Sequence, residues 1–177
     1  TSSFLLLQIG SDFSRKGVDR SIEALATLAK SIRNKTHLIV IGQDNPNKFI
    51  KLSQKLKVAT NIHFLLGRDD VPYFIAGCDI LLHPARSENT GTVILEALVG
   101  GLPEIATAEC GYAFYIAKAQ TGIILTTPFK QEKFNEQLKQ ALDKNLLQTW
   151  SNNAKQFSDK NNLSNLSQVA TNIIATK

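Results

Sequence analysis

Residues 4–42 read FLLLQIGSDFSRKGVDRSIEALATLAKSIRNKTHLIVIG, and this stretch already indicates the architecture of the chain. The apolar run at residues 4–9 has the length of a strand, and residues 18–32 then repeat apolar side chains at helical spacing. A second apolar run follows at residues 38–41. Both runs are continuous rather than alternating, so we expect strands that are buried on both faces. Strand, helix and strand in this order predict a parallel crossover unit.

The same alternation continues to the end of the chain. Strands are predicted over residues 62–66, 79–83, 103–107 and 123–126, and helices over 46–56, 69–77, 92–99, 111–117, 131–142, 147–157 and 163–174. The pattern predicts an α/β fold of the Rossmann-like, doubly wound type, with an open parallel sheet of about six strands and helices on both faces. Ligands of such sheets bind outside the carboxyl ends of the strands. The loops that follow the strands are therefore where we expect a site.

Composition excludes several classes of protein. The 177 residues suit one domain with a proper core, and the chain carries 20 Lys and Arg against 15 Asp and Glu, a net charge of +5. This balance favours anionic partners such as nucleotide phosphates or a membrane surface, but the basic residues form no block, so we expect no nucleic-acid partner. No apolar run approaches the roughly 18 residues that span a bilayer, and no signal-peptide pattern is present.

The cysteines and histidines carry no metal-site pattern. Cys78 and Cys110 are far apart, which suits a reducing cytosol, so we expect a cytoplasmic protein. His37, His63 and His83 lie in or beside apolar runs, and we interpret them as packed histidines without a metal.

The loop after the first predicted strand, residues 10–17, contains adjacent basic residues. Its spacing matches neither GxGxxG nor a Walker A loop. Arg15 and Lys16 lie at the expected mouth of the sheet, beside a glycine that lets backbone approach a ligand. An arginine guanidinium can form bidentate hydrogen bonds to phosphate oxygens, and lysine supplies a point charge. This combination suits a diphosphate. An ordinary solvated basic pair is the alternative.

The loop after the fourth predicted strand leads into an apolar helix. Asn89 or Thr90 would cap that helix, whose free amides and dipole suit phosphate. Asn89, Thr92 and Glu96 share one helix face, and we expect Glu96 to lie between core residues. A carboxylate there is costly unless it accepts hydrogen bonds, which the vicinal hydroxyls of a sugar would donate.

Glu88 and Glu96 lie eight positions apart. Eight helical residues rise about 12 Å, whereas the paired carboxylates of glycosidases lie roughly 5–9.5 Å apart. The spacing therefore indicates that the two carboxylates bind two different rings of one extended ligand, rather than acting together in hydrolysis of one bond. The alternative is that Glu88 is solvated and Glu96 caps a neighbouring backbone.

These loops resemble those of the family four retaining glycosyltransferases, which have the GT-B fold. Glu88-x7-Glu96, with Gly91 three residues after the first Glu, is similar to the signature of that family. Residues 10–19 resemble its diphosphate loop and residues 67–71 its nucleobase loop. The resemblance covers nearly the whole chain, and the members that build the lipopolysaccharide core are the most similar.

The resemblance implies a role for each matching residue. Arg15 and Lys16 would hold the diphosphate and stabilise the departing UDP, and Glu88 would bind hydroxyls of the donor hexose, so these three are the catalytic candidates. Glu96 would bind the ribose hydroxyls. The remaining donor-binding candidates are Gly10 and Gly17 in the first loop, Arg68 and Val71 beside the uracil, and Asn89, Thr90 and Gly91, whose amides face phosphate or sugar.

The implied reaction transfers glucose from UDP-glucose to a heptose of the lipopolysaccharide core, with retention at the anomeric carbon and without a metal or other cofactor. Because the chain starts at Thr1 and has no Met, we expect residues 1–177 to be a single donor-binding domain. It would be the C-terminal half of a GT-B protein whose N-terminal acceptor domain is absent here. The full-length protein would act in the cytoplasm, where peripheral association with the inner membrane is compatible with the charge.

Two alternatives and two departures from the family stay open. The chain would otherwise be an isolated nucleotide-sugar binding module without turnover, or part of a GT-B nucleotide-sugar epimerase. Asn89 stands where the family has a small or aromatic residue, which puts the identity of the donor sugar in doubt. Glu104 stands where the family has an apolar residue, so it needs an unusual partner or a strand end that is exposed.

Overall fold

All six strands of the sheet are parallel, and their order is β3-β2-β1-β4-β5-β6 in the computed structural model, which describes residues 3–161 and 163. The strands are β1 (Phe4–Ile9), β2 (Thr36–Ile41), β3 (Ile62–Leu65), β4 (Ile80–His83), β5 (Glu104–Thr107) and β6 (Gly122–Leu125). The predicted doubly wound parallel sheet is confirmed.

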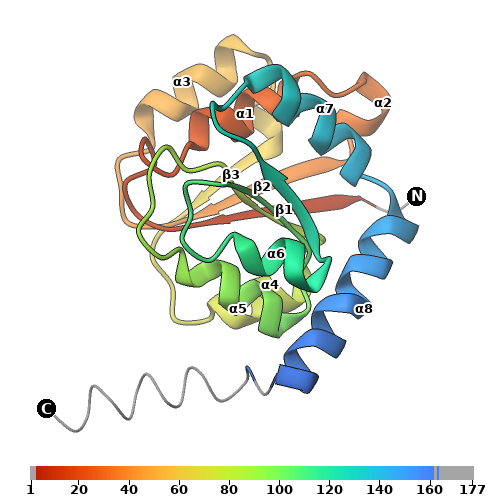
Figure 1. The fold of residues 1–177 in the computed structure, drawn as a ribbon. Coiled ribbons are helices and arrows are strands. Elements are labelled where there is room, and N and C mark those ends of the chain that lie inside the picture. The colour runs from red at the N-terminus through yellow and green to blue at the C-terminus, as the bar shows by residue number, and fades with distance from the viewer. Residues whose placement is uncertain (1–2, 162, 164–177) are drawn as a thin grey trace, which may run out of the picture.

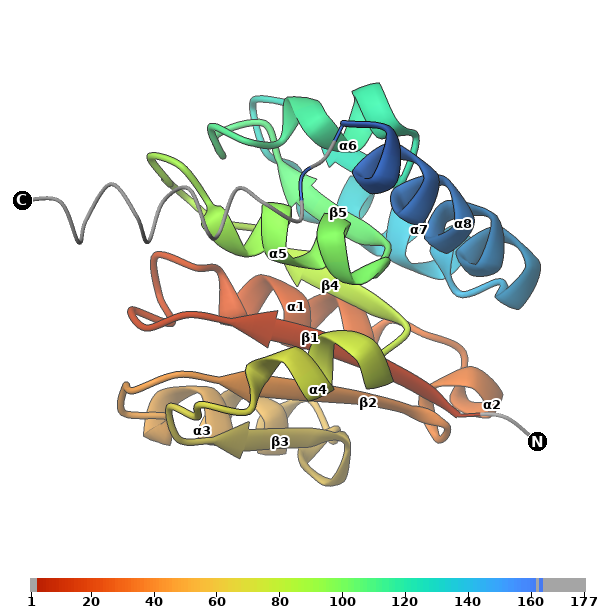
Figure 2. The ribbon, with the colours of Figure 1, turned by 90° about the horizontal axis from the view of Figure 1, so that it is seen from below.

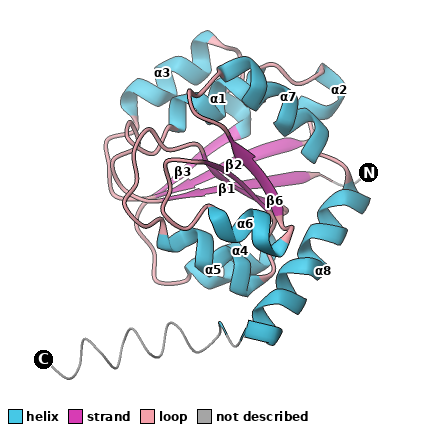
Figure 3. Ribbon diagram, viewed as in Figure 1, coloured by secondary structure: helices cyan, strands magenta, loops and turns pink. Residues whose placement is uncertain are grey.

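Helices cover both faces of this sheet (Figures 1 and 3). They are α1 (Val18–Ala26), α2 (Lys30–Arg33), α3 (Asn47–Lys55), α4 (Val71–Gly77), α5 (Thr92–Gly100), α6 (Phe114–Ala119), α7 (Gln131–Ala141) and α8 (Lys144–Asn161), with a 3-10 turn at Ala59–Asn61. One layer contains α1, α3 and α7, and the other contains α4, α5 and α6 with α8 against them (Figures 1 and 2). No helix among the described residues combines the length and the apolarity needed to cross a membrane.

The continuous apolar strands bury side chains into both layers. Leu6 packs into the core beneath α1 and α7, whereas Leu7 packs into the core beneath α4 and α5, and both are fully buried. Burial of one such side chain stabilises a fold by about 1.5–3 kcal/mol. Adjacent residues of β1 therefore hold the two layers on one sheet.

Two predicted helices have different bounds in the structure. The helix expected over residues 18–32 is interrupted at Ala29, whose ψ of 141° is not helical. Just before this break the Thr27 hydroxyl donates to the Ala24 carbonyl, 2.7 Å away. The helix expected over 147–157 begins earlier because Asp143 Oδ1 accepts from the backbone N–H groups of Asn145 and Leu146, at 2.9 Å each. The helix expected over 163–174 lies outside the described residues, apart from Leu163.

The strand order reverses beside β1, which pairs with β2 on one side and β4 on the other. Such a reversal leaves a crevice at the carboxyl ends of the central strands. The loops that follow β1 and β4 consequently lie next to each other at one edge of the sheet (Figure 1). That edge contains the basic pair and Glu88.

Candidate functional site

Two glycines shape the loop that follows β1. Gly10 and Gly17 have φ angles of 129° and 72°, which favour glycine. A Cβ atom on Gly17 would lie 2.1 Å from the carbonyl oxygen of Pro84, so only glycine lets the two loops approach this closely. The buried Gln8 donates from Nε2 to the carbonyl of Lys16 at 2.8 Å. These contacts fix the backbone that carries the basic pair.

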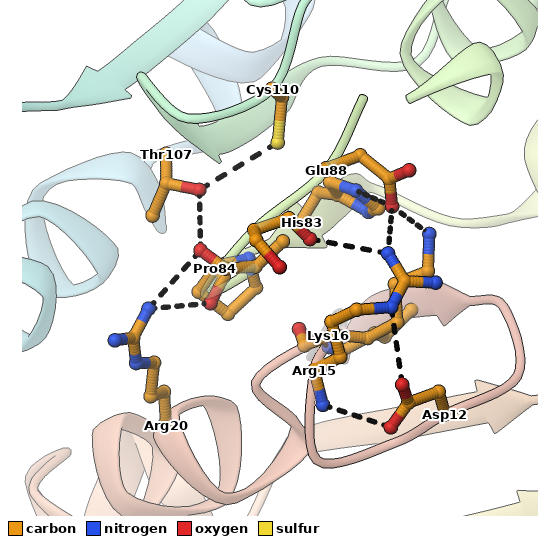
Figure 4. Close-up of polar contacts among 12 residues, drawn as sticks. Asp12, Arg15, Lys16, Arg20, His83, Pro84, Glu88, Thr107 and Cys110 are labelled. Carbon is orange, nitrogen blue, oxygen red and sulfur yellow. Dashed lines mark hydrogen bonds and ion pairs between the residues drawn. The ribbon is translucent and has the colours of Figure 1, made fainter. Parts of the chain in front are cut away.

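The loop after β4 is held by Arg20, a residue of α1. Its Nη1 donates to the carbonyls of Pro84 and Ala85 at 3.0 and 3.2 Å, and its guanidinium stacks 3.7 Å from the centre of the Phe129 ring. Thr107 Oγ1 donates to the same Ala85 carbonyl at 2.8 Å (Figure 4). The start of this loop is thus anchored from two neighbouring elements.

Glu88 extends from this loop onto the basic pair. Its Oε2 accepts from Lys16 Nζ and from Arg15 Nη1, the latter at 3.2 Å, while Arg15 Nε also donates to Asp12 at 3.1 Å (Figure 4). The side chains of Lys16 and Glu88 are only 12% and 11% exposed. The alternatives of a solvated Glu88 and of an ordinary solvated basic pair are therefore wrong for Glu88 and Lys16.

The ion pair outweighs the cost of burying Glu88. Desolvation by burial opposes ionisation of the carboxyl, but the hydrogen bond and charge of Lys16 and the charge of Arg15 hold the Glu88 pKa below its usual value. Glu88 is therefore a carboxylate at neutral pH.

His83, the last residue of β4, lies behind Glu88. Its side chain is fully buried, and Nε2 is 3.6 Å from Glu88 Oε2. Burial and the positive charge of Lys16 lower the His83 pKa to about 4 against the opposing effect of Glu88, so the ring is neutral at pH 7. The prediction of a packed histidine is confirmed for His83 and wrong for His63, which is exposed and lies 3.1 Å from His37.

Helix α5 begins without the predicted side-chain cap. Gly91, with a φ of 73°, is the N-cap residue, and neither Asn89 nor Thr90 caps the helix. A glycine cap satisfies no amide by a side chain, so the N–H groups of Thr92 and Val93 remain available to an anion, whereas that of Ile94 donates to the Gly91 carbonyl.

Glu96 differs from its expected environment. It lies on the exposed face of α5 with Thr92, not between core residues. Among the described residues no hydrogen bond or ion pair involves its carboxylate, so it caps no neighbouring backbone there, and desolvation raises its pKa. The Glu96 carboxylate is thus accessible to a hydrogen-bond donor such as a hydroxyl.

The loop after β5 forms the next wall of this edge. Cys110 bridges to Glu88 in parallel pairing, and the Tyr112 N–H donates to the Thr90 carbonyl at 2.9 Å. A Cβ on Gly111 would lie 2.3 Å from the Asn89 carbonyl oxygen. Close backbone packing against residues 110–112 therefore fixes residues 88–91.

Two predicted donor residues lie apart from this cluster. Arg68 follows β3 and forms two hydrogen bonds to Asp70, at 2.6 and 2.7 Å, and Val71 begins α4. Strand β2 separates β3 from β1. The structure thus places Arg68 and Val71 at a second position along the same edge, without a described contact to Arg15, Lys16 or Glu88.

Glu104 has neither of its expected environments. It is 1% exposed at the start of β5, and both carboxylate oxygens lack a hydrogen-bond partner among the described residues. Burial raises its pKa well above the usual value and so favours the neutral form of this carboxyl. It lies at the opposite end of β5 from the loop that contacts Glu88. No cluster of three or more potential metal ligands occurs among the described residues.

A family model described as "Glycosyl transferases group 1" matches residues 1–157. The chain belongs to this family. Among group 1 glycosyltransferases, it is 52% identical over 171 residues to the lipopolysaccharide glucosyltransferase WaaG of Escherichia coli K12, covering 96% of this chain and 46% of the relative. The chain thus spans about half the length of this curated relative.

Comparison with solved structures confirms the GT-B type of fold. The crystal structure of WaaG matches with a TM-score of 0.93 and 51% identity, over 98% of this chain and 47% of the other. Anabaena HepE, crystallised with UDP-glucose, matches in fold with a TM-score of 0.78 at 22% identity, over 99% of this chain and 49% of the other.

Proposed function

We propose that this chain is the donor-binding domain of a retaining glucosyltransferase that uses UDP-glucose and acts on a heptose of the lipopolysaccharide core. The observation that carries the proposal is the meeting of Arg15, Lys16 and Glu88 at the point where the strand order reverses. Two cations and one partly buried carboxylate at this place suit a diphosphate joined to a polyol.

The basic pair would hold the diphosphate. Arg15 and Lys16 would donate to its oxygens, and the uncapped amides of α5 would add further donors. Negative charge grows on the diphosphate as the bond to the sugar breaks, so fixed cations stabilise the transition state more than the bound donor. In this proposal the two side chains supply the stabilisation that a metal ion supplies elsewhere, and no metal is required.

The two glutamates would bind the two rings of the donor. Glu88 would accept hydrogen bonds from hexose hydroxyls, and Glu96 from the vicinal hydroxyls of the ribose. The backbone of residues 89–91, packed against Gly111, would line the sugar. Arg68 and Val71, further along the edge, would lie beside the uracil.

The names of two similar proteins support the choice of donor. The relative from Escherichia coli is a lipopolysaccharide glucosyltransferase, which supports glucose as the sugar and the lipopolysaccharide core as the acceptor. A protein with the same fold, HepE, binds UDP-glucose in its crystal structure. We place the full-length protein on the cytoplasmic side of the inner membrane, where nucleotide sugars are available.

Calorimetric titration with UDP, UDP-glucose and UDP-galactose tests the donor assignment. We expect UDP-glucose to bind more tightly than UDP-galactose, because the two sugars differ in the orientation of one hydroxyl and Glu88 would accept hydrogen bonds from the hexose hydroxyls. Glu96→Ala should weaken UDP by about 1.5–3 kcal/mol, since hydrogen bonds to a charged group are lost. Glu132→Ala, which removes an exposed carboxylate from α7, is the matched control. Unchanged UDP affinity in Glu96→Ala would remove the ribose role.

An assay with UDP-glucose and extracted core acceptor separates the proposal from its alternatives. Formation of a glycosidic product by the full-length protein supports the glucosyltransferase. Conversion of UDP-glucose into an epimeric UDP-sugar without such a product favours the epimerase, and tight binding without any turnover favours an isolated binding module.

A further inference from the structure

Two basic side chains donate to one oxygen of Glu88, and a histidine lies beside it. Oε2 accepts from Lys16 and Arg15, and His83 Nε2 lies 3.6 Å from the same atom (Figure 4). The imidazole is fully buried, and neither of its ring nitrogens has a hydrogen-bond partner among the described residues. Buried polar atoms without a partner are costly, so an unpartnered ring facing a carboxylate calls for an explanation.

The proposed donor competes with Glu88 for the same N–H groups. A diphosphate on Arg15 and Lys16 would engage the nitrogens that now donate to Glu88 Oε2. The Glu88 carboxylate is largely buried, so it then needs another group to donate a hydrogen bond to it. His83 Nε2 is close enough to become that donor after a small rotation of the Glu88 side chain.

We propose that His83 is a positioning residue that holds Glu88 when a donor diphosphate occupies Arg15 and Lys16, and that donor binding is coupled to uptake of one proton by His83. The proton comes from solvent and goes to the imidazole, while Glu88 stays a carboxylate. The proposal rests on the proposed function, because it needs a diphosphate at the basic pair. Beyond that function, it adds a hydrogen bond between His83 and Glu88, which would orient Glu88 toward the sugar only after the UDP-sugar is bound.

The direction of proton movement follows from the charges around His83. The charged groups that face it are Lys16, Arg15 and Glu88. Burial and then the charge of Lys16 lower the His83 pKa to about 4, and Glu88 opposes them. A diphosphate would neutralise Lys16 and leave Glu88 facing the ring, so the His83 pKa rises and the complex binds a proton. Donor affinity should therefore increase as the pH falls toward 6.

Calorimetry in buffers with different ionisation enthalpies measures this uptake directly. UDP-glucose is the probe, because a diphosphate that is esterified at both ends lacks the ionisation near pH 6 of a terminal phosphate. At pH 6.5 we expect the observed enthalpy of the wild-type protein to vary with the buffer in the direction of proton uptake. In His83→Asn this dependence should vanish, because Asn donates a hydrogen bond but binds no proton. His37→Asn, in the exposed histidine pair, should keep it.

The outcomes separate this proposal from the proposed function. Absence of UDP-glucose binding would overturn both. Binding with an enthalpy that is the same in every buffer, or proton uptake that persists in His83→Asn, would overturn the role of His83 and leave the donor site standing.

If His83→Asn fails to fold, nuclear magnetic resonance of the wild-type imidazole carbons answers the same question. The His83 pKa should rise on saturation with UDP-glucose, and an unchanged pKa would overturn the proposal.

Discussion

Lys16 and Glu88 form an ion pair that joins the loop after β1 to the loop after β4, across a sequence separation of 72 residues. The pair lies where the strand order reverses, and both side chains are mostly buried. In the free protein Glu88 therefore compensates the positive charge that we assign to diphosphate binding. In the proposed complex the diphosphate of the donor would compete with this carboxylate for the two cations.

Glu88→Gln should tighten the binding of UDP, because the amide competes less for Arg15 and Lys16. We expect the binding free energy of UDP to improve by about 1 kcal/mol, the upper value for an exposed ion pair, because this pair is mostly buried. The affinity would then rise roughly fivefold. UDP-glucose should gain less than UDP, since the substitution also weakens contacts with sugar hydroxyls. Calorimetry on both ligands measures the difference, with Glu132→Gln as the control. Weaker UDP binding in Glu88→Gln would show that the carboxylate does not compete.

Gly17→Ala should destabilise the fold by at least about 1 kcal/mol, because a side chain is strained at this positive φ. The new Cβ would also lie 2.1 Å from the Pro84 carbonyl oxygen and push the two loops apart. Gly77→Ala is the matched control, since a Cβ there meets no atom within 4 Å. Urea denaturation compares the two variants, and equal stabilities would contradict the close packing of these loops.

Glu104 should make the protein less stable as the pH rises. Its pKa is raised in the folded state, so above the ordinary value of 4.5 the unfolded chain loses its proton first. The contribution of this group to the free energy of unfolding is greatest below pH 4.5. It decreases as the pH rises from there to the raised pKa of the folded state.

Substitutions at Glu104 separate ionisation from polarity. Glu104→Leu should raise the free energy of unfolding at pH 8 by about 1–3 kcal/mol, the cost of an unsatisfied buried polar group. Glu104→Gln should remove the pH dependence with a smaller gain, because the amide stays buried. Denaturation curves at pH 5 and pH 8 measure both effects. A wild-type contribution that grows with pH would show that Glu104 is ionised in the fold.

Arg20→Lys should weaken UDP-glucose binding although Arg20 lies outside the proposed donor contacts. Lysine keeps the charge but loses the stacking on Phe129 and the pair of hydrogen bonds to the Pro84 and Ala85 carbonyls. The loop that carries Glu88 would then be less ordered, and we expect a loss of about tenfold, near 1.4 kcal/mol. Uridine binding, which does not use Glu88, should change little. Equal losses for both ligands would argue against a positioning role.

The sequence was sufficient for the sheet and for the location of the site, because continuous apolar strands and single crossovers leave few arrangements. Local hydrogen bonds were harder to foresee. The Thr27 hydroxyl at the end of α1 and the Asp143 carboxylate before α8 form one or two local hydrogen bonds each. The spacing of apolar residues, from which the helices were predicted, contains no information on such hydrogen bonds.

The environments of individual side chains also escaped the sequence. Glu96 was expected between core residues and is exposed, whereas Glu88, for which a solvated position was the alternative, is mostly buried, because exposure depends on how distant loops pack. Arg20 lies on a helix like any surface arginine, and only the tertiary fold brings it beneath the loop after β4. The one feature of the sequence that pointed to Arg20 was its basic side chain four positions after Lys16.

Binding of UDP compared with uridine tests the central claim most directly. Calorimetry should show that Lys16→Ala loses at least about 1.5 kcal/mol of UDP affinity, the value of one charge-assisted hydrogen bond, while uridine affinity is unchanged. Lys139→Ala, which removes an exposed lysine from α7, should bind both ligands like the wild-type protein. Equal losses of UDP and uridine affinity in Lys16→Ala, or no loss of either, would contradict a diphosphate site at Arg15 and Lys16.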